Sequence, residues 1–180
     1  MKIYNNAAEI IGNTPLVSFS GFSEKIGAKA AILAKLEYLN PAGSAKDRVG
    51  FEMLRCAMAE GKITKESVII EPTSGNTGIG IASVAAQMGL KVIITMPETM
   101  SVERRNLLSA YGAELVLTDG AKGMAGAIEK ANELAAETKN SFIPAQLDNP
   151  ANVQPHYKTT GPEIWNDTDG KVDVFVAGVR

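Results

Sequence analysis

From residue 67 onward the sequence alternates short apolar, β-rich runs with longer segments of helical periodicity, and few folds accommodate this pattern. Buried runs joined by helical crossovers are typical of a parallel sheet that is covered on both faces. We therefore predict a doubly wound α/β fold, in which ligands bind at the carboxyl ends of the strands. The predicted strands are 67–72, 90–97 and 113–119, and the predicted helices are 77–89, 101–112 and 121–139.

The flanking segments extend this pattern. Residues 30–39 predict a strand, residues 46–61 predict a helix that ends at Gly61, and residues 171–180 predict one more buried strand. Gly89 and Gly112 stand where a left-handed residue ends a helix.

The composition excludes several classes of protein. With 18 basic and 20 acidic side chains the net charge is -2, and no basic stripe indicates a nucleic-acid partner. No apolar run is long enough to span a bilayer, and the first residues do not resemble a secretory signal. The single cysteine, Cys56, falls in the apolar register of a predicted helix, which indicates a core thiol. We expect a cytoplasmic protein that binds neither membrane nor nucleic acid.

The loop in "EPTSGNTGIGIA" lies between a predicted strand and a predicted helix. Its backbone N–H groups and the hydroxyls of Thr73, Ser74 and Thr77 would converge at a helix N-terminus, which binds anions. Gly75 and Gly78 would let a ligand approach the backbone, because no Cβ stands in the way. The same residues also suit a simple capped turn, so an anion site and a turn remain equal alternatives here. The glycine spacing fits neither a dinucleotide fingerprint nor a nucleoside triphosphate loop.

The stretch "NPAGSAKDRVG" places Lys46 at the start of a helix, after a turn and the capping residue Ser44. The positive end of a helix dipole disfavours a charged lysine, so a lysine there loses its proton more easily. A neutral amine is the nucleophile that forms Schiff bases. The alternative is a solvated surface charge. The single histidine, His156, has no nearby acid or thiol motif and is interpreted as structural. The Arg104–Arg105 pair is interpreted as lying on a solvated helix face.

Several motifs follow one another along essentially the whole chain: "IGNTPLV", "NPAGSAKDR", "EPTSGNTGIGIA", "MPETMSVERR", "YGAELVLT" and "HYKTTGPEIW". Together they resemble the cysteine synthase family, also called O-acetylserine sulfhydrylase, which consists of pyridoxal-phosphate enzymes of fold type II.

The resemblance implies a role for individual residues. Lys46 would form the Schiff base with pyridoxal 5'-phosphate and would remove the substrate α-proton. Asn76 would bond the phenolic oxygen of the cofactor, and Gln146 would reach the substrate carboxylate. The loop that grips this carboxylate would consist of Thr73, Ser74, Gly75, Asn76 and Thr77. The residues alone support the loop and Lys46, whereas Gln146 rests on the resemblance.

The resemblance also implies a reaction and a domain arrangement. The reaction is β-replacement, in which O-acetyl-L-serine and sulfide give L-cysteine. The fold is of the tryptophan synthase β type, with a complete smaller domain at residues 47–149 inserted into an incomplete larger domain at residues 1–46 and 150–180. We expect apolar faces on residues 8–19 and 172–178 to lack partners, and we expect a homodimer.

In the family, a loop after the last strand binds the cofactor phosphate, whereas here the sequence ends at Arg180. Two alternatives to turnover therefore remain open. One is a catalytically silent fragment. The other is a binding module for a carboxylate or a peptide tail, such as the C-terminal tail of serine acetyltransferase.

Overall fold

A computed structural model of the protein describes residues 3–178 and contains a four-stranded parallel sheet. The strand order is β5-β4-β3-β6, and each neighbouring pair is parallel, which confirms the predicted parallel sheet. The strands are β3 (Val68–Pro72), β4 (Lys91–Pro97), β5 (Glu114–Thr118) and β6 (Ser141–Phe142). The first three were predicted as strands, whereas β6 was not, because its two residues are too short to show an alternating pattern.

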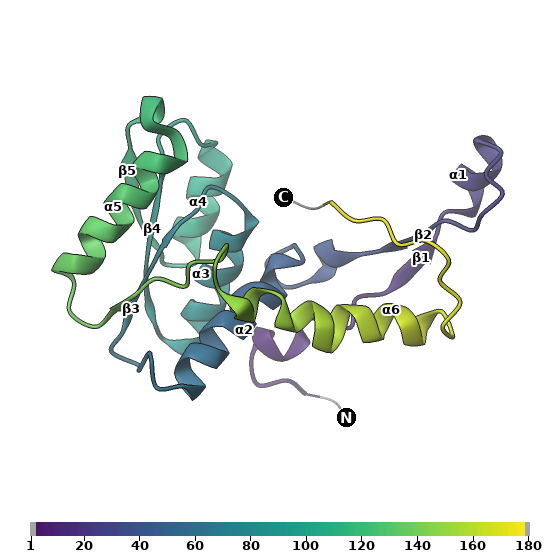
Figure 1. The fold of residues 1–180 in the computed structure, drawn as a ribbon, viewed down its shortest axis with the longest axis horizontal. Helices are drawn as coiled ribbons and strands as arrows, with labels where there is room; N and C mark the ends of the chain where they lie inside the picture. Colours follow the sequence, from purple (N-terminus) through teal and green to yellow (C-terminus); the bar gives the residue numbers. More distant parts are fainter. Residues whose placement is uncertain (1–2, 179–180) are drawn as a thin grey trace.

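Helices cover both faces of this sheet (Figure 1). One face packs against α5 (Gly123–Glu137), and the other faces α3 (Asn76–Met88), α4 (Val102–Ala110) and α2 (Lys46–Ala59). All four helices agree with the sequence prediction to within a few residues. Gly89 has φ 70° and caps α3, and Gly112, just after α4, has φ 82°, as expected for left-handed helix ends.

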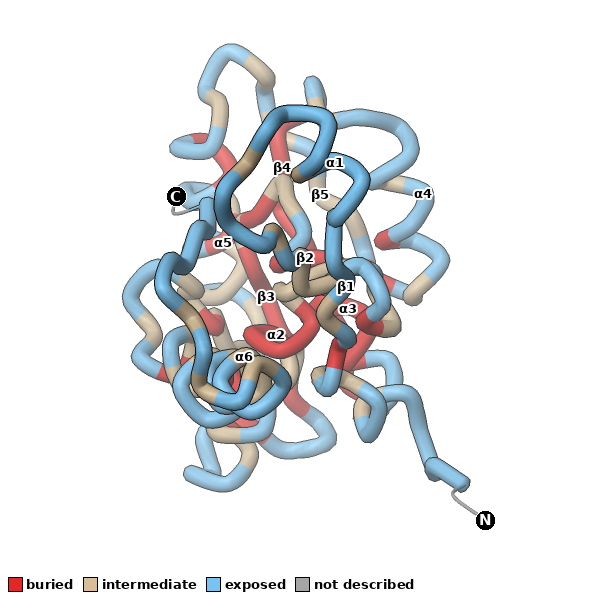
Figure 2. The backbone as a smooth tube through the Cα atoms, turned by 90° about the vertical axis from the view of Figure 1, so that its right-hand side faces the viewer, coloured by how far each residue is buried: buried red, intermediate tan, exposed pale blue. Residues whose placement is uncertain are grey.

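The core lies between the central strands and the α2–α3 pair (Figure 2). Ile69 and Ile70 on β3 and Ile94 and Met96 on β4 are fully buried. Burial on both sides explains why these strands are continuous apolar runs in the sequence. No helix of residues 3–178 is long and apolar enough to cross a membrane.

A smaller antiparallel sheet lies apart from the main one (Figure 1). Its strands are β1 (Leu16–Ser18) and β2 (Leu33–Lys35), and the short helix α1 (Ser20–Lys25) connects them. The strand predicted over residues 30–39 is therefore only partly correct, because residues 37–39 form a 3-10 turn instead. The remaining elements are the 3-10 turns η1 (Ala7–Ile10), η2 (Glu37–Leu39), η3 (Gly120–Lys122) and η4 (Pro150–Asn152), the π-helical turn η5 (His156–Thr160) and the helix α6 (Gly161–Asp167).

The prediction of a buried strand over residues 171–180 is wrong for the part that the structure describes. Residues 171–178 form no strand, and Val174, Phe175 and Val176 are 77%, 68% and 87% exposed. A β-rich run becomes a strand only beside another strand that takes its backbone hydrogen bonds, and none lies beside this segment in the described chain. The prediction about Arg180 lies outside the described residues.

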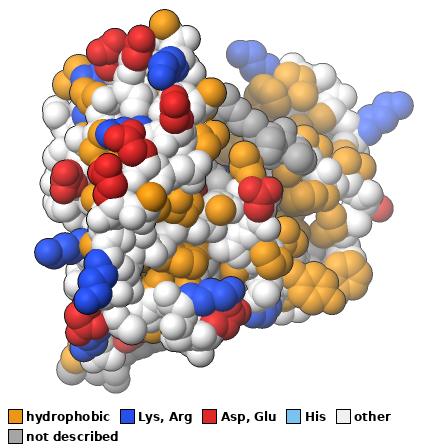
Figure 3. Space-filling view, turned by 60° about the vertical axis from the view of Figure 1, so that its left-hand side comes forward, with side chains coloured by type: hydrophobic (Ala, Val, Ile, Leu, Met, Phe, Trp, Pro, Cys, Tyr) orange, Lys and Arg blue, Asp and Glu red, His pale blue; other side chains and the backbone are white. Residues whose placement is uncertain are grey.

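Exposed apolar side chains gather on the part of the molecule away from the main sheet (Figure 3). They include Phe19, Phe22 and Leu33 around the small sheet, with exposed fractions of 44%, 55% and 47%. The expectation of exposed apolar faces concerned residues 8–19 and 172–178, and it is confirmed for Phe19 in the first range and for Val174, Phe175 and Val176 in the second.

Candidate active site

The predicted substrate loop lies at the point where the strand order of the main sheet reverses. The chain runs from β3 to β4 to β5 in one direction, and β6 then pairs with the other side of β3. In parallel sheets the loops on either side of such a reversal separate and leave a crevice for ligands. The loops after β3 and β6 carry Thr73–Thr77 and Gln146.

The structure brings these two loops into contact. The hydroxyl of Thr77 donates a hydrogen bond to Oε1 of Gln146, with a distance of 2.5 Å between the oxygens. The Nε2 group of Gln146 donates to no acceptor within residues 3–178, so both its N–H bonds are available to a ligand. Gln146, which only the family resemblance singled out, therefore joins the loop that the residues themselves predicted.

The loop presents unused donors at the start of α3. Gly75 is the N-cap residue of α3 and provides no side-chain cap, and the N–H groups of Asn76 and Thr77 donate to no acceptor of the described chain. The hydroxyl oxygen of Thr73 accepts a hydrogen bond from the N–H of Gly75, with 3.4 Å between oxygen and nitrogen, and so shapes the turn. Free N–H groups at a helix N-terminus attract an anion through hydrogen bonds and the helix dipole.

The two glycines of the loop have different roles. A Cβ at Gly75 would meet no atom within 4 Å, which agrees with a backbone open to a ligand. A Cβ at Gly78 would lie 2.5 Å from the methyl group of Thr73. The structure therefore gives Gly78 an internal packing role rather than the ligand approach that the sequence predicted.

Lys46 reaches the neighbourhood of this loop because α2 and α3 touch backbone to backbone. A Cβ at Gly80 would lie 2.6 Å from the carbonyl oxygen of Lys46, and a Cβ at Gly50 would lie 2.8 Å from the backbone of Gly80. Such close crossings require glycine, because any side chain would push the helices apart. Gly80 stands one helical turn after Thr77, so the crossing brings the backbone of Lys46 to within about one turn of the start of α3.

Lys46 is the first residue of α2 and is half-buried. Its backbone N–H donates to the hydroxyl of Ser44 at 3.1 Å, so Ser44 contributes to the helix start as predicted, although Ala45 is the N-cap residue. The side-chain amine forms no hydrogen bond or ion pair with any described residue. The amine is thus unengaged and accessible, as a lysine that condenses with an aldehyde must be.

His156 is close enough to Lys46 for their charges to interact. Burial lowers the pKa of His156, and the positive charges of Lys46 and Arg48 lower it further. The Nδ1 atom of His156 lies 3.0 Å from the hydroxyl of Thr160. The histidine therefore has a protein partner, which agrees with its structural interpretation.

Arg48 forms a buried ionic cluster that the sequence did not reveal. The guanidinium is 2% exposed and pairs with Glu37 at 2.7 Å and with Glu163 at 2.6 Å, and Lys35 also pairs with Glu163 at 2.9 Å. Burial alone would raise the pKa of Glu163, but hydrogen bonds from Arg48 and Lys35 lower it to about 2. The cluster holds the first turn of α2, and with it Lys46, against η2 and α6.

Arg104 is a second residue that sequence reasoning missed. Although α4 is solvated at this position as predicted, the Arg104 guanidinium donates to the carbonyl oxygen of Ser74 at 3.2 Å. This contact fixes one peptide of the predicted substrate loop. Arg105 instead donates to the carbonyl oxygens of Met100 and Glu98, in the loop just before α4. A pair of arginines on a helix face gives no signal that each of them binds a different loop.

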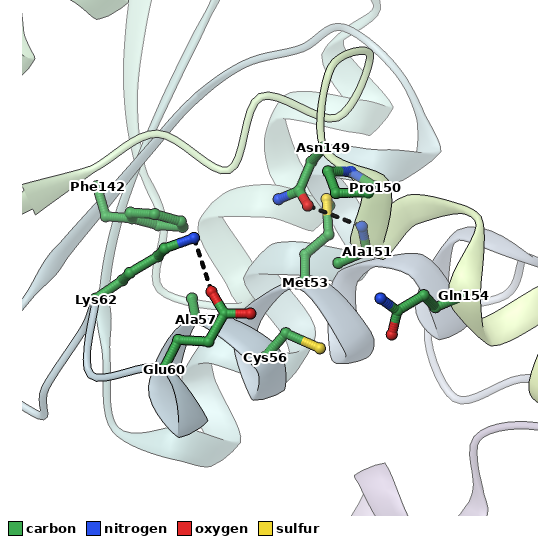
Figure 4. A pocket seen from close by; sticks show the side chains of 10 residues that line it. All are labelled: Met53, Cys56, Ala57, Glu60, Lys62, Phe142, Asn149, Pro150, Ala151 and Gln154. Carbon is green, nitrogen blue, oxygen red and sulfur yellow. Dashed lines mark hydrogen bonds and ion pairs between the residues drawn. The ribbon is translucent and has the colours of Figure 1, made fainter.

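A separate cavity lies between the second half of α2 and residues 142–154 (Figure 4). None of the predicted site residues lines it. Its walls combine Met53, Cys56 and Phe142 with polar groups such as Asn149. Residues 3–178 contain no cluster of histidine, cysteine or acidic side chains that could hold a metal ion.

Comparison with known proteins extends these observations. A family model described as pyridoxal-phosphate dependent enzyme matches residues 7–180. The chain is 54% identical to a cysteine synthase of Flavobacterium sp. over 98% of its own length and 56% of the relative. It is 53% identical to cysteine synthase A of Escherichia coli (strain K12), over 99% of this chain and 54% of the relative. The chain thus spans about half the length of the curated relatives it matches.

The chain also superposes on solved structures of enzymes with related sequences. A hydrogen sulfide-producing enzyme from Fusobacterium nucleatum gives a TM-score of 0.90 at 45% identity and covers 98% of this chain and 57% of its own. Cysteine synthase from Entamoeba histolytica gives a TM-score of 0.88 at 47% identity, over 96% of this chain and 52% of its own.

Proposed function

The chain belongs to the family of pyridoxal-phosphate-dependent enzymes, and we propose that it acts in the manner of a cysteine synthase. It would convert O-acetyl-L-serine and sulfide into L-cysteine and acetate. The observation that carries this proposal is the placement of Lys46, with an unengaged amine, beside a loop whose N–H groups are free to bind a carboxylate. The printed names of the relatives agree with it.

The residues present suit the cofactor and the substrate. Lys46 would hold the cofactor by bonding to the aldehyde carbon of the cofactor. Asn76 would form a hydrogen bond with the phenolic oxygen of the cofactor. The Thr73–Thr77 loop and Gln146 would bind the carboxylate of the amino acid. Once bound, pyridoxal phosphate supplies an electron sink for the α-carbon of the substrate.

The proton chemistry would belong to Lys46. Once the amine of the substrate has released Lys46 from the cofactor, Nζ of Lys46 would take the α-proton of O-acetylserine, and the electron pair released at the α-carbon would expel acetate from the β-carbon. Sulfide then adds to the β-carbon, and Lys46 returns the proton to the α-carbon.

The test is to mix the chain with pyridoxal phosphate and to record the visible absorption spectrum. Covalent capture by a lysine gives a band that free cofactor lacks, and Lys46→Ala is expected to remove it. Lys62→Ala is the matched control, because Lys62 is an exposed lysine that pairs, among the described residues, with Glu60 alone. A band that survives in the Lys46→Ala variant would move the cofactor site elsewhere, and no band in the unaltered chain would count against turnover.

A second candidate function is that of a carboxylate-binding module. The free N–H groups of Asn76 and Thr77 and the free Nε2 of Gln146 favour it, because they require no cofactor. The ligand would be a peptide that ends in a carboxylate, such as the C-terminal tail of serine acetyltransferase. Binding of such a peptide by the Lys46→Ala variant, as measured by calorimetry, would support this function, whereas an amidated peptide should not bind.

The division into domains also remains a proposal. A smaller domain at residues 47–149, inserted between residues 1–46 and 150–180, is supported by the position of all four parallel strands within it. We likewise propose a homodimer that covers exposed apolar residues such as Phe22 and Leu33. Light scattering would test it, and a monomer at all concentrations would contradict it.

A further inference from the structure

Glu71 is a buried acid that the proposed reaction does not use. It is the fourth residue of β3, is 1% exposed, and forms no ion pair with any described residue. Its two carboxylate oxygens accept hydrogen bonds from two consecutive backbone N–H groups. Ala145 donates to Oε2 at 3.0 Å, and Gln146 donates to Oε1 at 3.4 Å.

This carboxylate contacts the chain where the backbone is strained. Ala145 has φ 51°, in the left-handed region that residues with a Cβ adopt rarely. Its carbonyl oxygen accepts the N–H groups of Asp148 and Asn149 at 3.0 Å, so the turn pivots on this residue. Such a conformation persists only where surrounding contacts determine it, and Glu71 supplies two of them.

The side chain of Gln146 extends from this turn. Its backbone is held on both sides, by Glu71 at the N–H and by Nδ2 of Asn152 at the carbonyl oxygen, 2.6 Å away. Its side chain then meets the hydroxyl of Thr77, which leaves Nε2 free. Glu71 is thus the link from the central strand to Gln146.

We infer that Glu71 is a positioning residue that fixes the turn at Ala145 and thereby aims the Gln146 amide at the bound carboxylate. The identity of this ligand rests on the proposed function, whereas the hold on the turn does not. A carboxylate suits the task because both of its oxygens accept, whereas an amide would present its own donors to one of the two N–H groups.

The first measurement begins with the unaltered chain and is then repeated in a variant. Amide hydrogen exchange, followed by NMR, should show Ala145 and Gln146 protected in the unaltered chain. At a pH above about 7, where Glu71 is ionised, exchange at both amides should accelerate about tenfold to a hundredfold in Glu71→Gln, the range expected for losing a hydrogen bond to a charged group. The matched control is Glu114→Gln, an exposed glutamate at the start of β5, which should change neither rate. Unprotected amides in the unaltered chain, or unchanged rates in Glu71→Gln, would overturn the inference.

The second measurement separates positioning from general stability. Acetate serves as the probe, and its affinity is taken from the shift of the Gln146 side-chain amide or, in variants that lack it, of the Thr77 backbone amide. Glu71→Gln and Gln146→Ala should each weaken binding by about tenfold, and the double variant should weaken it no further, because both act through one side chain. Losses that multiply in the double variant would contradict the inference. If the unaltered chain does not bind acetate, the proposed carboxylate site fails, and the exchange rates still decide the role of Glu71.

Discussion

At the scale of single residues, the proposed site depends on residues whose side chains form few hydrogen bonds within the protein, while hydrogen bonds hold their backbones in place. Lys46 keeps a free amine while Ser44 takes its backbone N–H. Gln146 keeps a free Nε2 while Glu71 and Asn152 hold its backbone. Groups that already stand in place lose little freedom when a ligand binds, so such a site binds more tightly than a mobile one.

The raised pKa of Glu71 should be visible in the pH dependence of the free energy of unfolding. Burial raises its pKa from 4.5 to about 7, although the N–H groups of Gln146 and Ala145 oppose the shift. The folded state therefore binds the proton more tightly than the unfolded state, and stability falls as the pH rises through this window. We expect the free energy of unfolding to drop by about 3 kcal/mol between about pH 4 and about pH 8 relative to Glu71→Gln.

Urea denaturation of both proteins at several pH values gives this difference directly. The comparison cancels other acids, such as Glu163, which titrates at about 2, below the window. A difference between the two proteins that does not change with pH would contradict the prediction.

At the scale of helices and strands, local patterns predicted most of what forms. The strands β3, β4 and β5 and the helices α2 to α5 are long enough for their apolar periodicity to appear in the sequence. Segments that form a strand only by pairing with another strand were predicted incorrectly. β6 consists of two residues that gain strand geometry by pairing with Val68 and Ile69, and residues 171–178 stay unpaired although their sequence favours a strand.

The crossing of α2 and α3 predicts a specific sensitivity. In Gly80→Ala the new Cβ would stand 2.6 Å from the carbonyl oxygen of Lys46, so the helices must separate. We expect a loss of about 1–3 kcal/mol in unfolding free energy, together with weaker capture of pyridoxal phosphate. Gly21→Ala in α1 is the control, because a Cβ there meets nothing within 4 Å and should leave both quantities nearly unchanged. Equal effects of the two substitutions would contradict the steric explanation.

The ionic cluster predicts a large effect from one arginine. Arg48→Met would leave the largely buried Glu37 without a cation and Glu163 with Lys35 alone, and the loss of a buried partner of this kind costs about 3–5 kcal/mol. Lys62→Met breaks an exposed pair with Glu60 and should cost less than about 1 kcal/mol. Thermal or urea denaturation would measure both, and a small effect of Arg48→Met would show that the two glutamates find other partners.

At the scale of the whole molecule, the topology decides where the site forms. The strand order β5-β4-β3-β6 could not be read from local patterns, because β6 was not recognised, yet it brings Thr77 and Gln146 together. The sequence predicted the Thr73–Thr77 loop and Lys46 from their own chemistry. It gave no sign of Arg48, Arg104 or Glu71, because each acts through contacts far along the chain.

The division between buried and exposed parts predicts unequal local stability. Amide hydrogen exchange should be slowest in β3 and β4, whose central residues are fully buried, and fastest in β1, β2 and α1, whose apolar side chains are largely exposed. Exchange measured by mass spectrometry on peptic fragments would test this order. Uniform protection across these segments would contradict it.

The contact between Gly80 and the carbonyl of Lys46 also governs how movements travel through the protein. Where two helices meet through side chains, a small displacement is absorbed as those side chains change rotamer. Here backbone meets backbone, and no rotamer is available to take up the movement. A shift of α3 toward α2 should therefore displace the backbone of Lys46. A substitution beneath α3 should therefore change the reach of Lys46 without altering any residue of the proposed site.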